Sequence, residues 1–390
     1  MTNEEHSPES ESMSEPAEWA SRRARDERTA QSRVAEFSIA YTRYIDPGGA
    51  AVAALPPHAR DSKRLLAQYR NMVLLRLFDR KAVALQRTGQ LGTYPSSLGQ
   101  EATAIGLGAA MAREDVLLGT YRETGTMLAR GVRMTEILQY WGGDEIGMDY
   151  SGPEAPRQDF PICVPIATHA PHAIGVAYAF KMRHEPRVAV CVLGDGATSK
   201  GDFYEALNAA GVWRLPIIFL IVNNAWAISV PRDAQSRAET LAQKAIAAGI
   251  EGEQVDGNDL IAVYDVTKRA LDKARDGRGP HVIEALTYRM HDHTTADDAR
   301  RYRSEDDVEK HAALDPVKRM RAYLARLGVW SDADDAALEE TLAHEVEVAA
   351  SEYLATPPRP AASMFDHLFA RLPDALRAQY AALAGDSGDE

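Results

Sequence analysis

The stretch Gly194–Asn224, GDGATSKGDFYEALNAAGVWRLPIIFLIVNN, decides the fold class. The apolar run RVAVCVL ends just before it, and the run PIIFLIV ends just before the paired asparagines Asn223 and Asn224. Uninterrupted apolar runs of this length are typical of strands that are buried on both faces of a parallel sheet. A right-handed crossover through the helix-like segment between the runs brings both strand ends to one edge. The sequence therefore predicts an α/β fold with a mostly parallel sheet flanked by helices.

Asp195 and Asn224 follow the two strand ends, at the carboxyl edge where open α/β sheets bind ligands. Each side chain offers an oxygen, and Mg²⁺ is usually held by few protein oxygens together with phosphate oxygens. A lone GDG is more often a glycine turn with an acidic helix cap, but the paired asparagines favour a metal site. A dinucleotide fingerprint would need glycine at Ser199, and a Walker-type phosphate loop would need Ser or Thr at Gly201.

Composition narrows the class of protein. The 390 residues carry a net charge of −13, which argues against a nucleic-acid-binding surface. Cys163 and Cys191 lie in apolar segments and indicate buried thiols, not a disulfide framework. No apolar run is long enough to span a bilayer, and the Glu- and Ser-rich N-terminus lacks a basic targeting pattern. We expect a cytoplasmic protein that binds neither nucleic acid nor membrane.

The chain is expected to have four segments: a disordered acidic tail (1–35), an α/β domain with N-terminal helices (36–330), a C-terminal helical extension (331–380) and an acidic tail (381–390). Helical periodicity is strong over residues 60–90 and continues over 99–112, whereas HVIEALTY at 281–288 predicts another buried strand. Prolines within 357–360 predict a break in the C-terminal helices, and a last helix is expected over 364–380.

Several motifs together resemble the alpha subunit of the decarboxylating component of 2-oxo acid dehydrogenase complexes. GDG followed by NN looks like the thiamine diphosphate motif, and GDFYEALNAAGVW, NNAWAIS and TYRMHDHTTADDARRYRS agree with the family in order and spacing. The resemblance runs from about Phe37 to about Tyr380. It implies thiamine diphosphate-dependent oxidative decarboxylation of a 2-oxo acid, with acyl transfer to lipoyl-lysine of an acyltransferase core. The motifs favour pyruvate, with branched-chain 2-oxo acids and acetoin as alternatives.

The resemblance also assigns residues to the cofactor. The backbone carbonyl of Trp226 completes the Mg²⁺ ligands beside Asp195 and Asn224, and Tyr121 and Arg122 contact the diphosphate. A planar, permanently charged guanidinium suits that last role. The full set of cofactor-binding residues implied by the resemblance is Tyr121, Arg122, Ile166, Gly194, Asp195, Gly196, Ala197, Asn224, Trp226 and His293.

His293 is the catalytic candidate. It lies just past the strand HVIEALTY, so it belongs to the same carboxyl edge, and a histidine there can donate to a developing negative oxygen or transfer a proton. The resemblance implies that this loop histidine stabilises the negative oxygen and assists the reaction with the lipoyl group. His291 is a competing candidate, but it fits the catalytic position of the family less well than His293 does. Arg289 and Asp297 resemble the pair that orders the loop. Thr294 stands where some mitochondrial relatives carry a serine that is phosphorylated.

Two departures from the family pattern leave parts of the site open. Many relatives carry a second active-site histidine before the residue that supports the bent cofactor, here Ile166, but this chain has none between Trp141 and Thr168. Some relatives place an arginine directly before the paired asparagines, where this chain has Val222. Gly196 fits the pattern, because a side chain there would block the approach of phosphate to the backbone donors of the next helix.

One group needed for thiamine activation is missing, namely a carboxylate against the aminopyrimidine ring. The resemblance implies that a beta subunit brings this glutamate across an interface, within an α₂β₂ heterotetramer, so the chain alone is expected to be inactive. An NAD-dependent dehydrogenase and a non-catalytic scaffold subunit remain distant alternatives. Ser199 disfavours the first, and the intact Asp195, Asn224 and His293 disfavour the second.

Overall fold

The computed structural model describes residues 33–385, so most of the expected tail at 1–35 and the end of the tail at 381–390 lie outside the described residues. The chain divides into two units, with the boundary after Ser38. The second unit contains a six-stranded sheet in which every pairing is parallel. Its strands, in spatial order, are β1 (Ala40–Thr42), β7 (Glu251–Asp256), β8 (His281–Leu286), β4 (Ile217–Asn223), β3 (Ala189–Gly194) and β2 (Val116–Leu118). The predicted α/β fold with a mostly parallel sheet is confirmed.

The apolar runs form strands because both faces of the sheet are covered. Successive side chains of a strand point to opposite faces, and each face of β4 enters a separate core. One core receives Ile218, Leu220 and Val222, and the other receives Ile217, Phe219 and Ile221. A strand that is buried on both faces carries no polar alternation, which is why its sequence is apolar throughout.

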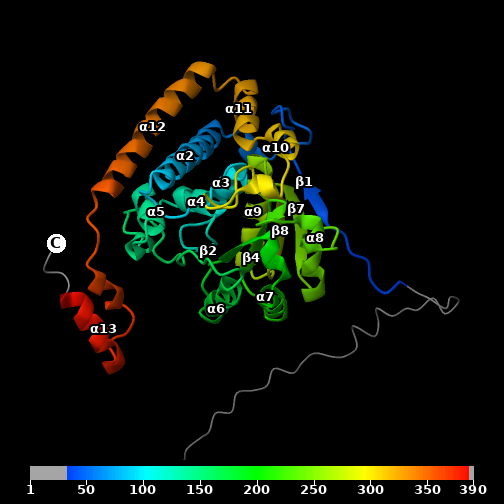
Figure 1. Ribbon diagram of the computed structural model, residues 1–390. Coiled ribbons are helices and arrows are strands. Elements are labelled where there is room, and N and C mark those ends of the chain that lie inside the picture. The colour runs from blue at the N-terminus through cyan, green and yellow to red at the C-terminus, as the bar shows by residue number, and fades with distance from the viewer. Residues whose placement is uncertain (1–32, 386–390) are drawn as a thin grey trace, which may run out of the picture. The chain divides into compact units, whose positions relative to one another are not determined.

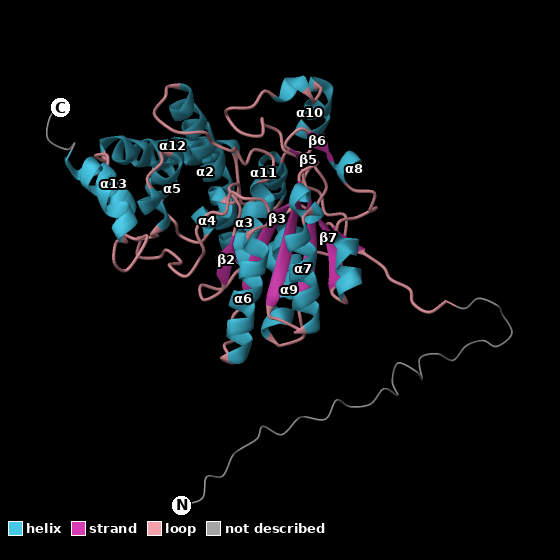
Figure 2. Ribbon diagram, turned by 60° about the horizontal axis from the view of Figure 1, so that its bottom comes forward, coloured by secondary structure: helices cyan, strands magenta, loops and turns pink. Residues whose placement is uncertain are grey.

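Helices α2, α3 and α9 contribute to the first core, and α6 and α7 contribute to the second. Figure 2 shows α6 and α7 lying along the strands. The helices are α2 (Ser62–Arg87), α3 (Glu101–Ala110), α4 (Thr124–Ala129), α5 (Met134–Trp141), α6 (His169–Met182), α7 (Gly201–Val212), α8 (Arg232–Gln235), α9 (Leu260–Arg275), α10 (Glu305–Ala312), α11 (Pro316–Arg326), α12 (Asp332–Ala355) and α13 (Asp374–Gly385). Among residues 33–385, no helix has the length and apolar character needed to cross a bilayer.

Short elements complete the chain. A small antiparallel pair, β5 (Trp226–Ala227) and β6 (Val230–Pro231), comes directly after the paired asparagines. The 3₁₀ helices are η1 (Pro57–Arg60), η2 (Glu145–Met148), η3 (Asp195–Ser199), η4 (Ala242–Ala248), η5 (Ala299–Arg301) and η6 (Ala361–Phe365). Gly196 therefore lies in η3, and the α-helix that was expected directly after it begins at Gly201.

The C-terminal region has one long helix, α12, which packs against α2 and α5 (Figure 1). It ends at Ala355, before the prolines, as predicted. The prediction of a last helix over 364–380 is wrong in its start, because α13 begins at Asp374. A helix from Met364 would carry Pro373 in its interior, where the ring removes a hydrogen bond and clashes with the preceding turn.

Candidate active site

A cavity of about 200 Å³ lies where strands β3 and β4 end. Parallel strands direct their carboxyl ends to one edge, so the loops after different strands meet there. Every residue that the sequence assigned to cofactor binding lines this cavity: Tyr121, Arg122, Ile166, Gly194, Asp195, Gly196, Ala197, Asn224, Trp226 and His293. The structure thus brings together the complete set, which spans more than 170 residues of sequence. The role of each residue remains a prediction.

Asp195 and Asn224 follow directly after the neighbouring strands β3 and β4, which pair through Gly194 and Val222. Asp195 is 2% exposed, and within the described part of the chain its Oδ2 has no hydrogen-bond partner. Burial raises the pKa of this carboxyl to about 6. A buried carboxylate oxygen without a partner is costly unless a cation or donor completes it, so the position favours a ligand.

The Asn224 amide is fixed from two sides. Its Nδ2 donates to Gln100 Oε1 at 3.2 Å, and its Oδ1 accepts from the Trp226 backbone N–H at 3.3 Å. The Trp226 carbonyl accepts from Arg289 Nη1 at 3.2 Å and keeps a second lone pair. Among residues 33–385 no cluster of three His, Cys, Asp or Glu side chains suits a metal, so the candidate ligands are one carboxylate, one amide and one carbonyl. This all-oxygen set fits a hard cation such as Mg²⁺.

Two glycines of the GDG turn differ in what surrounds them. A Cβ at Gly194 would meet nothing within 4 Å, whereas a Cβ at Gly196 would lie 2.8 Å from Ala227 Cβ and 3.2 Å from Gln235 Nε2. Gly196 is therefore required because it packs closely against the β5 hairpin. This reason differs from the expected one, which was that a side chain would block the approach of phosphate. Gly194 is the glycine that leaves open space at the cavity.

Arg122 and Tyr121 come from the loop between β2 and α4. The Arg122 guanidinium is buried and donates to the Ser96 carbonyl at 2.6 Å and to the His293 carbonyl at 2.8 Å. The rings of Tyr121 and His293 meet edge to face, with centroids 5.8 Å apart. Ile166 is 42% exposed at the cavity, which leaves apolar surface uncovered in this chain.

The His293 ring is held in its neutral form. Its Nδ1 lies 3.3 Å from Arg122 Nη2 and 3.4 Å from Arg289 Nη1. Burial lowers the pKa of His293 to about 4, and the two guanidinium groups lower it further. The Asp297 carboxylate has the opposite effect on this pKa but does not outweigh them. Because guanidinium groups only donate, Nδ1 accepts and the ring hydrogen resides on Nε2. His293 can then donate one hydrogen bond from Nε2 at neutral pH.

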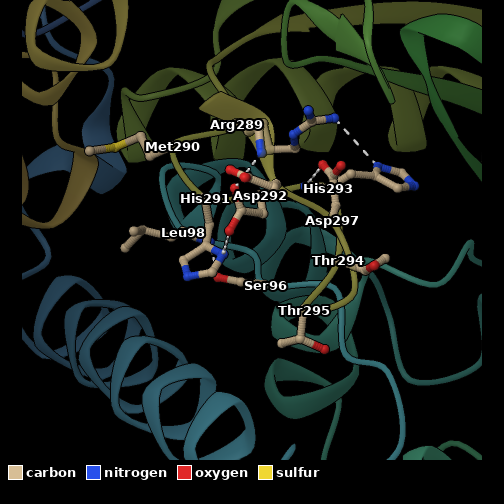
Figure 3. A network of polar contacts seen from close by, with 12 residues as sticks. Ser96, Leu98, Arg289, Met290, His291, Asp292, His293, Thr294, Thr295 and Asp297 are labelled. Atoms are coloured by element: carbon tan, nitrogen blue, oxygen red, sulfur yellow. Dashed lines mark hydrogen bonds and ion pairs between the residues drawn. The ribbon is translucent and has the colours of Figure 1, made fainter. Parts of the chain in front are cut away.

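Arg289 and Asp297 both hold the loop that carries this histidine. Arg289 is fully buried and its Nη2 donates to the Ile228 carbonyl at 2.7 Å and to the Tyr302 hydroxyl at 2.8 Å. Asp297 accepts from the His293 backbone N–H at 3.0 Å and from the same Tyr302 hydroxyl. Both contacts fit the expected loop-ordering role. In Figure 3 the rings of His291 and His293 point to opposite sides of the loop, and only His293 lines the cavity.

Sequence reasoning missed several cavity residues. Gln100 and Gln235 line the cavity, and each has one amide atom without a hydrogen-bond partner in the described part of the chain. Gln100 had a weak signal as the polar residue before a helix of small residues, and Gln235 had none. Cys163 lines the cavity in the segment that lacks the second histidine, but burial raises the pKa of its thiol. The thiol therefore stays protonated at neutral pH and cannot accept a proton in place of the missing histidine. The apolar Val222 also lines the cavity and contributes no charge.

Comparison with known proteins agrees with this geometry. The family model of the dehydrogenase E1 component matches residues 69–361. The 3-methyl-2-oxobutanoate dehydrogenase subunit alpha of Mycobacterium tuberculosis is 44% identical over 264 residues, which cover 67% of this chain and 71% of the relative. The pyruvate dehydrogenase E1 component subunit alpha of Acholeplasma laidlawii is 40% identical over 320 residues, covering 81% and 91%. The protein of that name from Staphylococcus aureus is 38% identical over 319 residues, covering 82% and 85%.

Proposed function

The chain belongs to the dehydrogenase E1 component family, and we propose that it is the alpha subunit of a thiamine diphosphate-dependent 2-oxo acid dehydrogenase. It takes part in the oxidative decarboxylation of a 2-oxo acid and uses thiamine diphosphate together with a beta subunit. The acyl product passes to lipoyl-lysine of an acyltransferase core. The observation that carries this proposal is the single cavity lined by all ten expected cofactor residues, with the unpartnered Asp195 oxygen among them.

Mg²⁺ is the proposed partner of the cofactor diphosphate. Asp195 Oδ2, Asn224 Oδ1 and the Trp226 carbonyl would hold it, since all three are oxygen atoms of the same strand-end region. When bound, thiamine diphosphate supplies the nucleophilic carbon, and the protein supplies binding, orientation and electrostatics. Arg122 and Tyr121 orient the diphosphate, and His293 donates its Nε2 hydrogen to oxygen that becomes negative during the reaction.

The size of the cavity supports a cofactor shared between two subunits. Ligand pockets usually measure about 300–1,000 Å³, and this cavity is smaller. Val164, Ile166 and Ile228 are 48%, 42% and 54% exposed, so apolar side chains near the cavity are left for a partner surface. We propose that the beta subunit covers this side, contributes the glutamate that activates the aminopyrimidine ring, and assembles with the chain as an α₂β₂ heterotetramer.

The substrate is proposed to be pyruvate, in line with the sequence motifs and with the pyruvate dehydrogenase relatives that match over 81% and 82% of the chain. The 3-methyl-2-oxobutanoate dehydrogenase relative has higher identity over a shorter stretch and makes a branched-chain 2-oxo acid the second candidate. One or two methylene groups in an apolar pocket change discrimination by only about 1–3 kcal/mol each. The cytoplasmic location, which rests on the composition of the N-terminus, is likewise a proposal.

The test is decarboxylation by the chain co-purified with its beta subunit, with thiamine diphosphate, Mg²⁺ and an artificial electron acceptor. Pyruvate and 3-methyl-2-oxobutanoate are compared, and preferred turnover of one acid names the substrate. The chain alone and the complex with Asp195→Ala serve as controls, and both are expected to be inactive. Turnover of neither acid by a cofactor-loaded complex would move the assignment to acetoin cleavage, and absence of cofactor binding would refute the metal site.

A further inference from the structure

Asp79 is a buried carboxylate in the middle of helix α2, and it does not line the cofactor cavity. We propose that Asp79 is a positioning residue, which fixes the segment Tyr94–Ser97 and through it holds Arg122 and the His293 loop in their working geometry. The inference rests on the proposed roles of Arg122 and His293. It adds to the site a residue that the cavity lining does not include.

The Asp79 carboxylate accepts three hydrogen bonds from the segment Tyr94–Ser97. It accepts from the Tyr94 hydroxyl at 2.6 Å, from Ser96 Oγ at 2.7 Å and from the Ser97 backbone N–H at 2.5 Å. Burial raises the pKa of Asp79, and these three donors oppose that effect. Asp79 is an interior residue of its helix and so caps no helix end. Its hydrogen-bonding capacity is directed at the segment, and removing it would leave buried donors unsatisfied.

The segment Tyr94–Ser97 in turn forms two hydrogen bonds with Arg122. The Ser96 carbonyl accepts from Arg122 Nη1 at 2.6 Å, and Ser97 Oγ donates to the Arg122 carbonyl at 3.2 Å. The other arm of the same guanidinium, Nη2, donates to the His293 carbonyl at 2.8 Å and lies 3.3 Å from its Nδ1. A planar fork that is fixed at one arm is also fixed at the other. The orientation of Arg122 against His293 therefore depends on where Ser96 is held.

The same segment also pairs with the loop that carries His293. Tyr94 N–H donates to Thr295 Oγ1 and Thr295 N–H donates to the Tyr94 carbonyl, both at 2.9 Å. Just beyond the segment, Met290 N–H donates to the Leu98 carbonyl at 3.2 Å. Figure 3 shows Ser96 and Leu98 beside this loop, on the side of His291. The anchored segment and the residue that follows it thus contact the loop on both sides of His293 in sequence, and the segment contacts the arginine that faces the His293 ring.

The experiment measures turnover of the assembled alpha–beta complex against pH, with Asp79→Asn and a matched control, Asp259→Asn. Asp259 is also buried, but it accepts backbone N–H groups just after β1 and at the start of α9, and it does not line the cavity. For Asp79→Asn we expect kcat/KM to fall at least about tenfold, with the acidic limb of the profile moving to higher pH. The control is expected to lose stability without moving the profile.

The direction of the pH change separates positioning from a simple charge effect. The groups that face the His293 ring or its backbone are Tyr121, Arg122, Arg289 and Asp297. Moving a guanidinium away raises the pKa of His293. Loss of the Asp79 charge acting through space would lower it instead. An unchanged or downward-shifted profile in a folded Asp79→Asn complex would therefore overturn the proposal.

A double-mutant cycle with Arg122→Lys tests the route. If Asp79 acts through Arg122, turnover by the double variant is about as slow as turnover by the slower single variant. If the fold-losses of the two single variants multiply in the double variant, the proposal is contradicted. If Asp79→Asn does not assemble, Ser96→Ala keeps the carboxylate, and we expect a smaller shift of the profile in the same direction; no shift overturns the proposal. An inactive wild-type complex would instead refute the proposed function, so the two failures are distinguishable.

Discussion

Replacing Asp195 by Asn should make the cofactor-free protein more stable while it removes cofactor binding. Burial raises the pKa of Asp195 from 3.8 to about 6, and a change of that size corresponds to about 3 kcal/mol. The folded state therefore binds more protons than the unfolded state between these two pH values, so stability falls as pH rises through them. The full cost is present above about pH 6. Asn carries no charge, so we expect a gain of about 2–3 kcal/mol at pH 7 and little gain at pH 4.

The assay is urea unfolding of the full chain without cofactor, at pH 7 and pH 4, for wild type and Asp195→Asn. Asp233→Asn, on the exposed surface of α8, is the control and should stay within about 0.5 kcal/mol of wild type at both pH values. Added thiamine diphosphate and Mg²⁺, in the presence of the beta subunit, should stabilise the wild type and Asp233→Asn but not Asp195→Asn. If Asp195→Asn is no more stable than wild type at pH 7, or gains equally at pH 4, the burial argument for this carboxylate is refuted.

Four other substitutions test the geometry of the site. Gly196→Ala should lose about 1–3 kcal/mol of unfolding free energy in urea titrations, because its Cβ would overlap the hairpin after the asparagines. Gly194→Ala should stay within about 1 kcal/mol of wild type but weaken cofactor binding in calorimetry, because its Cβ enters open cavity space. His293→Gln should lower kcat by about 10²–10⁴, with His291→Gln as the nearly neutral control in the same steady-state assay. Arg289→Lys should lower turnover at least about tenfold, since an ammonium cannot span the two carbonyls and the hydroxyl that the guanidinium reaches.

Each of these outcomes has a contrary result. If Gly194→Ala and Gly196→Ala lost the same unfolding free energy, the loss would come from the backbone of the turn and not from the different atoms around the two positions. Larger losses for His291→Gln than for His293→Gln would reverse the assignment of the catalytic histidine. Full activity of Arg289→Lys would show that the loop is ordered without the buried guanidinium.

The sequence predicted those parts of the site that depend on local pattern. A strand buried on both faces is a plain apolar run, and the residues just past its end lie on the carboxyl edge of the sheet. Asp195, Asn224 and His293 could therefore be placed at this edge from the sequence alone, and all three line the cavity there. The missed features depend on contacts between distant segments. Gln235 reaches the cavity from a four-residue helix, and Asp79 acts on a segment fifteen or more residues away. Neither position carries a periodic or motif signal of its own.

Strand β1 has a consequence for how the chain is made. It pairs with β7, and the backbone N–H of Tyr44 just after it donates to Asp259, 215 residues later. Strand β1 therefore leaves the ribosome long before strand β7, with which it pairs, and pairing over such separations is slow. Synthesis must also pass His293 before the cavity has all its walls. A ligand of this cavity can then act only on chains that already extend past His293, so it affects how long the folded cavity persists and not how early folding begins.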